Sequence, residues 1–214
     1  MKKILIATAV ISALVSSQAF AEDAKLVGAY AGAELGYTRV QNDAQATANA
    51  LVNAVGGSVI VTQDTGVVIG RLFAGYNINE NIALELGYLQ TGDVTQRAAG
   101  VARNSVAYTG SANVSVSGVD YAVLIRPSVA SGLNGLFAKI GGHYLEASQD
   151  ATLTGTSTVS VTSSVKGSGF LVGFGYQAAV ADNVDVRATY TYYDSVAGGN
   201  GYANVVSVGL LGKF

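Results

Sequence analysis

One segment of the chain, NVDVRATYTYYD at residues 183–194, strongly limits the folds that are open to it. Apolar or aromatic residues occupy every second position, and charged or hydroxyl-bearing residues occupy most positions between them. In a β-strand, alternate side chains lie on opposite faces, whereas a helix with about 3.6 residues per turn would mix the two sets. The segment is therefore predicted to be a strand with one apolar face. That face consists of Val184, Val186, Ala188, Tyr190 and Tyr192.

The same alternation recurs along the chain between groups of turn residues. We expect eight strands, at residues 26–40, 65–78, 81–95, 112–128, 135–149, 166–181, 183–196 and 203–214. Tight turns are expected near residues 77–81, 131–135 and 181–183. Long connections are expected at 41–64, 96–111 and 150–165, with a shorter one at 197–202. An even number of antiparallel strands, with short turns at one end and long loops at the other, is typical of an up-and-down outer-membrane β-barrel.

The first residues, MKKILIATAVISALVSSQAFA, have the pattern of a secretory signal peptide. A positive pair, Lys2 and Lys3, precedes a short apolar stretch, and small residues complete an A-x-A-like cleavage site at Ala21. The apolar stretch is shorter than the roughly 18 residues that a membrane-spanning helix needs. We therefore expect residues 1–21 to be removed after export and residues 22–214 to form one barrel domain.

The composition fits a protein whose outer surface faces lipid. Charged residues make up 12% of the chain, against about 25% in an ordinary soluble domain. The chain has 27 Gly, 12 Tyr and no Cys, so disulfides cannot stabilise it after export. The net charge of −2 argues against binding to nucleic acid, which requires a basic surface.

A secreted β-sandwich also has alternating strands, and two features favour the barrel over it. First, tyrosines lie near strand ends on the apolar face, as in the aromatic girdle of a membrane barrel. These are Tyr37, Tyr76, Tyr88, Tyr144, Tyr190 and Tyr192. Second, the opposite face carries acids and bases at mid-strand, and in a closed barrel that face is the interior.

The interior of an eight-stranded barrel is just wide enough to be filled by side chains. Because an isolated buried charge is costly, acids and bases there should pair. The predicted lumen charge network is Glu34, Arg71, Glu85, Asp120, Arg126, Lys139, Asp185 and Arg187. His143 and Lys213 share this face. The near balance of acids and bases favours a filled polar lumen over a wide pore.

Several segments resemble the small OmpA-type, or OmpX-like, outer-membrane barrels. They are YAGAELGYT, LFAGYNINENIALELGY, GFGYQAAVADNVDVRATYTYYD and the final VVSVGLLGKF. The resemblance implies an outer-membrane location, contact with outer-membrane lipid, and a last strand that the barrel-insertion machinery reads. The matching residues of that signal are Val206, Val208, Leu210 and Phe214. Gly212 departs from the pattern, because a bulky residue is common at that position.

Some barrels of this kind modify lipids with Ser and His residues, and His143 is the only histidine here. Alternation points His143 into the lumen, away from lipid, so we interpret it as a structural polar residue. We expect no catalytic residue, no cofactor and no metal site, because the chain lacks Cys and has no carboxylate-rich loop of the calcium type.

Two segments rich in Thr, Ser and Val, at 105–118 and 151–165, have strong β propensity and little charge. One hypothesis is that they continue the strands beyond the membrane as an exposed sheet, whose edge binds host or envelope proteins by strand addition. The alternative is that they are mobile loops. Three functions stay open: a structural or surface-interaction protein, a small low-conductance pore or conduit for a small solute, and a lipid-modifying enzyme.

Overall fold

The computed structural model describes residues 27–39, 48–49, 52, 57–101, 106–127, 134–199 and 201–214. The predicted signal peptide at 1–21 lies outside these residues. Within the described ranges, no helix has both the length and the apolar character needed to cross a membrane.

Eight strands form a closed antiparallel ring, which confirms the expected up-and-down barrel. Their bounds are β1 Gly28–Arg39, β3 Gly66–Asn77, β4 Ile82–Thr91, β6 Ala107–Ile125, β7 Leu136–Thr154, β8 Thr158–Ala181, β9 Val184–Tyr193 and β10 Ala203–Lys213. Each strand of the ring pairs with the next one along the chain, and β1 pairs with β10 to close it. Closure removes the free edges that an open sheet would present.

Two further strands lie where the sequence predicted long loops. β2 (Ser58–Gln63) falls within the expected connection 41–64, and β5 (Val94–Val101) largely within 96–111. Two residues separate β2 from β3, and Gly92 and Asp93 separate β4 from β5. The antiparallel pair of β3 and β4 therefore continues outward as the antiparallel pair of β2 and β5. The expectation of loops was wrong there because each short segment finds a strand partner: β5 pairs with β6, and β2 pairs with β5.

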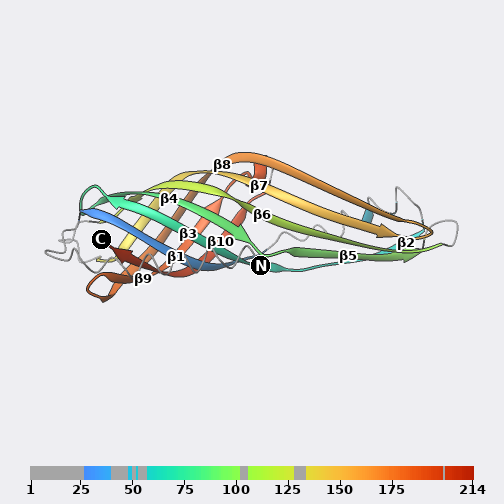
Figure 1. Cartoon of the computed structure of the whole chain (residues 1–214), viewed down its shortest axis with the longest axis horizontal. Helices are drawn as coiled ribbons and strands as arrows, with labels where there is room; N and C mark the ends of the chain where they lie inside the picture. Colours follow the sequence, from blue (N-terminus) through green and yellow to red (C-terminus); the bar gives the residue numbers. More distant parts are fainter. Residues whose placement is uncertain are drawn as a thin grey trace.

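The strands β2 and β5 join the outer parts of β6, β7 and β8 in a sheet that projects beyond the ring (Figure 1). We call this part the sheet extension; it comprises residues 58–63, 94–101, 107–116, 146–154 and 158–166. β7 and β8 remain paired up to Thr154 and Thr158. The hypothesis that 105–118 and 151–165 continue the strands is therefore confirmed for their described residues. A short helix, η2 (Val196–Gly198), lies between β9 and β10.

Alternation along the ring strands separates a lipid-facing surface from the lumen. In β4, Ala83, Glu85 and Leu89 are buried, whereas Leu84 and Leu86 are 49% and 61% exposed. Leucine is exposed on the outside and glutamate buried on the inside, which is the reverse of a soluble protein and typical of a membrane barrel. The core of the molecule is therefore the lumen.

The opposite end of the ring has tight connections, as the sequence predicted for 77–81 and 181–183. At the first turn, the side-chain Oδ1 of Asn79 accepts hydrogen bonds from the backbone N–H groups of Asn81 and Ile82 (2.9 and 2.8 Å). This Asx arrangement fixes the turn locally. At the expected turn 131–135, residues 131–133 lie outside the described ranges.

Candidate functional site

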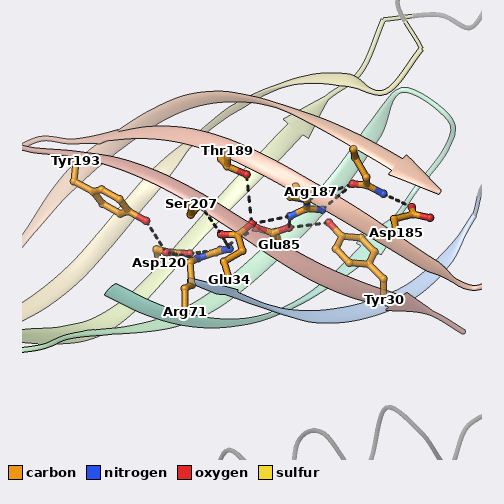
Figure 2. Close-up of polar contacts among 11 residues, drawn as sticks. Tyr30, Glu34, Arg71, Glu85, Asp120, Asp185, Arg187, Thr189, Tyr193 and Ser207 are labelled. Carbon is orange, nitrogen blue, oxygen red and sulfur yellow. Dashed lines mark hydrogen bonds and ion pairs between the residues drawn. The ribbon is translucent and has the colours of Figure 1, made fainter. Parts of the chain in front are cut away.

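A cluster of charged and polar side chains occupies the lumen of the ring, and Arg71 of β3 contacts three of its carboxylates (Figure 2). Arg71 donates through Nη2 to Asp120 Oδ1 (2.6 Å) and through Nε to Asp120 Oδ2 (2.8 Å), which is a bidentate pair. Its Nη2 also donates to Glu85 Oε1 at 2.9 Å, and its Nη1 lies 3.5 Å from Glu34 Oε2. All four side chains are buried. One guanidinium therefore joins carboxylates from three other strands.

Arg187 of β9 makes the second set of contacts. Its Nη1 donates to Glu85 Oε2 at 2.7 Å and lies 3.7 Å from Glu34 Oε1. Its Nε and Nη2 donate to Gln177 Oε1, and Gln177 in turn donates to Asp185 Oδ2 at 2.6 Å. We call Glu34, Arg71, Glu85, Asp120 and Arg187 the lumen cluster.

Neutral donors add hydrogen bonds to carboxylate oxygens that the two arginines already contact. Tyr30 donates to Glu85 Oε2 and Tyr193 to Asp120 Oδ2, each at 3.2 Å. Thr189 and Ser207 donate longer bonds, 3.4 and 3.5 Å, to Glu34. A buried ion pair is tolerated only when such additional hydrogen bonds offset its lost hydration. The lumen cluster meets this condition.

Aromatic rings pack against both guanidinium groups. The Phe73 ring contacts both, with its centroid 5.0 Å from Arg71 Cζ and 4.7 Å from Arg187 Cζ. Phe137 and Tyr30 lie 5.1 and 5.6 Å from Arg187 Cζ. These cation–π contacts fill the space beside the charges, so the lumen at this level contains packed side chains.

Glycines on the facing strands make room for these side chains. A Cβ atom added to Gly87 would lie 2.6 Å from Arg71 Nη2 and 2.7 Å from Asp120 Oδ1. One added to Gly209 would lie 2.6 Å from the Glu34 Cγ atom. Both distances are too short for non-bonded atoms, so the cluster and its neighbouring glycines depend on each other.

The structure brings together five members of the predicted charge network and separates three. Asp185 ion-pairs with Lys213 at 2.8 Å and reaches Arg187 only through Gln177. Lys139 is buried in the lumen, but no described carboxylate lies within ion-pairing distance of its ammonium group. Arg126 lies past the end of β6 and donates to Asn77 Oδ1 at 2.8 Å, so it is not part of the cluster.

Sequence reasoning missed several uncharged residues that contact the cluster. They are Tyr30, Phe73, Phe137, Gln177, Thr189, Tyr193 and Ser207. The sequence did contain a signal for some of them. Tyr30 lies four positions before Glu34, and Phe73 lies two positions after Arg71, so each pair is expected on the same face of its strand. The prediction listed only side chains that are charged at neutral pH, so it left these inward-facing aromatic residues out.

His143 is 1% exposed, and its Nε2 lies 2.7 Å from the backbone oxygen of Asp194. Its ring packs edge-on against Tyr193, with centroids 5.6 Å apart. No serine hydroxyl contacts it among the described residues, and this part of the chain contains no group of three or more His, Cys, Asp or Glu residues suited to a metal ion.

The remaining predicted site residues lie on the outer surface. Tyr37, Tyr76, Tyr88 and Tyr144 are each about half exposed there, and Tyr190 and Tyr192 are partly exposed on the same face. Sequence reasoning did not include Tyr121, Phe170, Phe174 and Tyr176, which are also exposed. Val206, Val208, Leu210 and Phe214 are 48–60% exposed along the outside of β10 and at its end.

Comparison with known proteins gives the family. No curated protein matches the chain. Among solved structures, Ail of Yersinia pestis, in complex with the heparin analogue sucrose octasulfate, is 12% identical with a TM-score of 0.46, and the match covers 87% of this chain and 99% of that one.

OprG of Pseudomonas aeruginosa is 12% identical (TM-score 0.45; 87% and 96% covered), as is the N-terminal barrel domain of OprF from the same organism (TM-score 0.44; 88% and 99% covered). The model of the OmpA-like transmembrane domain matches residues 25–213. The chain therefore belongs to this family of outer-membrane β-barrels.

Proposed function

We propose that this outer-membrane barrel is a non-enzymatic surface-interaction protein that binds an extended segment of a partner protein at the outer edge of β8. The observation that carries the proposal is the pairing of Thr158–Lys166. These residues pair with β7 on one side, and no described strand pairs with their other side. Further along β8, η2 contacts Gly167, and β9 pairs from Leu171 onward.

The edge residues of β8 suit strand addition. Val159, Val161 and Val165 are each more than half exposed on one face, and the other face carries mostly Ser and Thr. Soluble proteins protect such an edge with prolines or several charges. Here the stretch has no proline, and Lys166 at its end is the one charged residue. An extended segment would gain backbone hydrogen bonds from the edge and side-chain contacts from the valines.

The test compares two lysine substitutions at the same height of the sheet extension. Val161 of β8 lies directly opposite Ala151 of β7, so Val161→Lys places a charge on the free edge and Ala151→Lys places it one strand further in. The assay is adhesion of otherwise non-adherent cells, displaying equal amounts of each variant, to an epithelial monolayer. We expect wild type and Ala151→Lys to adhere and Val161→Lys to fall to the background.

Two results would contradict strand addition at this edge, and a third would contradict binding to a host surface. One is full adhesion by Val161→Lys. Another is equal loss in both variants, which would assign binding to the face of the sheet. The third is no adhesion by wild type, which would remove the host-surface role. Binding between two copies of the chain would appear as cell-to-cell clumping without the monolayer.

The lumen cluster argues against the alternative of a pore. Its side chains come from β1, β3, β4, β6 and β9, pack against aromatic rings, and leave the acids paired. We expect planar-bilayer recordings of the purified protein to show no steady conductance. A steady channel whose conductance changes in Arg71→Ala would favour the pore.

A further inference from the structure

A cavity of about 390 Å³ lies at the mouth of the barrel, between the lumen cluster and the sheet extension. Its walls come from several ring strands, from β5 and from the segment between β9 and β10. Most lining side chains are apolar, among them Ile69, Leu89, Val94, Val116, Leu145 and Val205. Pockets of about 300–1,000 Å³ lined mainly by apolar side chains are the usual binding sites for small molecules.

The interior of this mouth cavity carries no charge of its own. Among the described lining residues, Arg39 is the one with a charged side chain. In β1, Glu34 and Thr38 are buried on the lumen face, whereas Leu35 and Tyr37 are exposed on the outer face. Arg39 lies two positions after Tyr37 and four after Leu35, so its side chain belongs to the same outer face. A charged ligand would lose hydration in the cavity without gaining a counter-charge.

Tyr193 separates the cavity from the lumen cluster. This residue lines the cavity, donates to Asp120 of the lumen cluster and packs against His143. At the side of the sheet extension, Gln96 Nε2 donates to Gln63 Oε1 at 3.0 Å, and both residues line the cavity. The hydroxyl-bearing residues Thr38, Thr91, Tyr193 and Tyr202 also line the cavity, and the hydroxyl groups of Thr38 and Tyr193 donate to other groups. The amide pair gives the cavity a polar contact suited to a hydroxyl group. A molecule in the cavity would therefore rest above the charges, with at most one polar end near the amides.

We propose that the mouth cavity binds a single small, uncharged apolar molecule, an aliphatic or aromatic compound with at most one hydroxyl group. The preformed apolar walls provide the affinity, and the absence of an inward charge sets the selectivity against ions. This site is separate from the β8 edge, so it stands or falls independently of the proposed partner binding.

Because the chain contains no Cys, one introduced thiol reports on the cavity. Val116→Cys places that thiol in the cavity wall, and Val165→Cys places one on the exposed part of β8, outside the lining residues. Both variants are folded into lipid nanodiscs, and the rate of maleimide labelling is measured with no addition, with 1-octanol and with octanoate at neutral pH. We expect 1-octanol to slow labelling of Val116→Cys several-fold, octanoate to have little effect, and Val165→Cys to respond to neither.

A second variant shows whether protection requires the cavity volume. Val67 lines the cavity from β3, so Val67→Phe in the Val116→Cys background should abolish protection by 1-octanol while the barrel keeps its heat-dependent shift in gel mobility. The proposal is overturned if 1-octanol gives no protection, if octanoate protects equally, or if protection survives Val67→Phe. It is also overturned if the thiol of folded Val116→Cys is unreactive before any addition, because other parts of the chain would then fill the cavity.

Discussion

The ring and the sheet extension are built from the same kind of strand, and β6, β7 and β8 run through both, yet their interiors differ. In the ring, each strand has two partners, and the closed lumen holds arginines and carboxylates that are 5% exposed or less. In the sheet extension, β2 and the outer part of β8 have one described partner each. The ion pair of Lys166 with Glu146 is largely open to water there, with side chains 52% and 35% exposed.

The difference between the two regions shows how closure of the sheet changes the demands on an alternating strand. When a sheet closes, its inner face leaves water, so polar residues on that face must find precise partners. When the sheet stays open, the inner face needs no such partners, and its edge keeps unpaired backbone groups. We therefore expect stability to depend on the ring and binding to depend on the sheet extension.

The largest effect should follow from disturbing ring closure itself. Phe214 lies at the end of β10, and its backbone N–H donates to Ala29 of β1 at 3.0 Å. We expect deletion of Phe214 to reduce the folded, heat-shifted protein in outer membranes several-fold, because it removes this bond to β1 and the terminal residue of the insertion signal that we propose for β10. Phe214→Tyr should assemble normally. Normal surface levels of the deletion variant would contradict this role.

The next prediction compares one charge from each region. Arg71→Ala leaves Glu85 and Asp120 buried without their shared guanidinium, so the free energy of unfolding in lipid vesicles should fall by about 3–5 kcal/mol. Lys166→Ala breaks the exposed pair with Glu146 and should cost about 0–1 kcal/mol. Both values come from urea titrations of the folded barrel. If the two variants lose similar amounts, the contrast between the regions is wrong.

A smaller effect is expected from adding one methyl group beside the lumen cluster. Gly87→Ala forces its Cβ against Arg71 and Asp120, so it should destabilise the barrel by about 1–3 kcal/mol. Gly201→Ala is the control: a Cβ there would meet nothing within 4 Å, and its effect should stay within about 0.5 kcal/mol. The same urea titration measures both, and a neutral Gly87→Ala would indicate a loosely packed lumen.

The smallest effect should come from shortening the tip of the sheet extension. Residues 153–159 join Thr152 to Ser160, which are paired neighbours. Replacing them with Asn-Gly, which favours a tight hairpin turn, should change the free energy of unfolding by no more than about 0.5 kcal/mol, as for other exposed tips. A larger loss would mean that the ring depends on the sheet extension.

Much of this architecture could be predicted from local patterns. The alternation in 183–194 predicted a strand and assigned Asp185 and Arg187 to the inner face, and both are buried there. The strands β2 and β5 could not be predicted in the same way, because a short Val- and Ala-rich segment becomes a strand only when a partner lies beside it. For β5 that partner is the outer part of β6, which the prediction began at residue 112 and the structure begins at Ala107; for β2 it is β5.

The sequence by itself determined the eight strands of the ring and the face that their side chains take, because the two-residue period is local; it did not determine β2 and β5. Tertiary structure decided which inner residues meet. Arg187 contacts Glu85 across the lumen, 102 positions away in the chain, whereas Lys139 shares their face but lies outside the ion pairs. Such contacts depend on the stagger of the strands and the radius of the closed ring. The mouth cavity and the open edge of β8 also depend on tertiary structure, because they arise where the strands of the ring stop pairing with both neighbours.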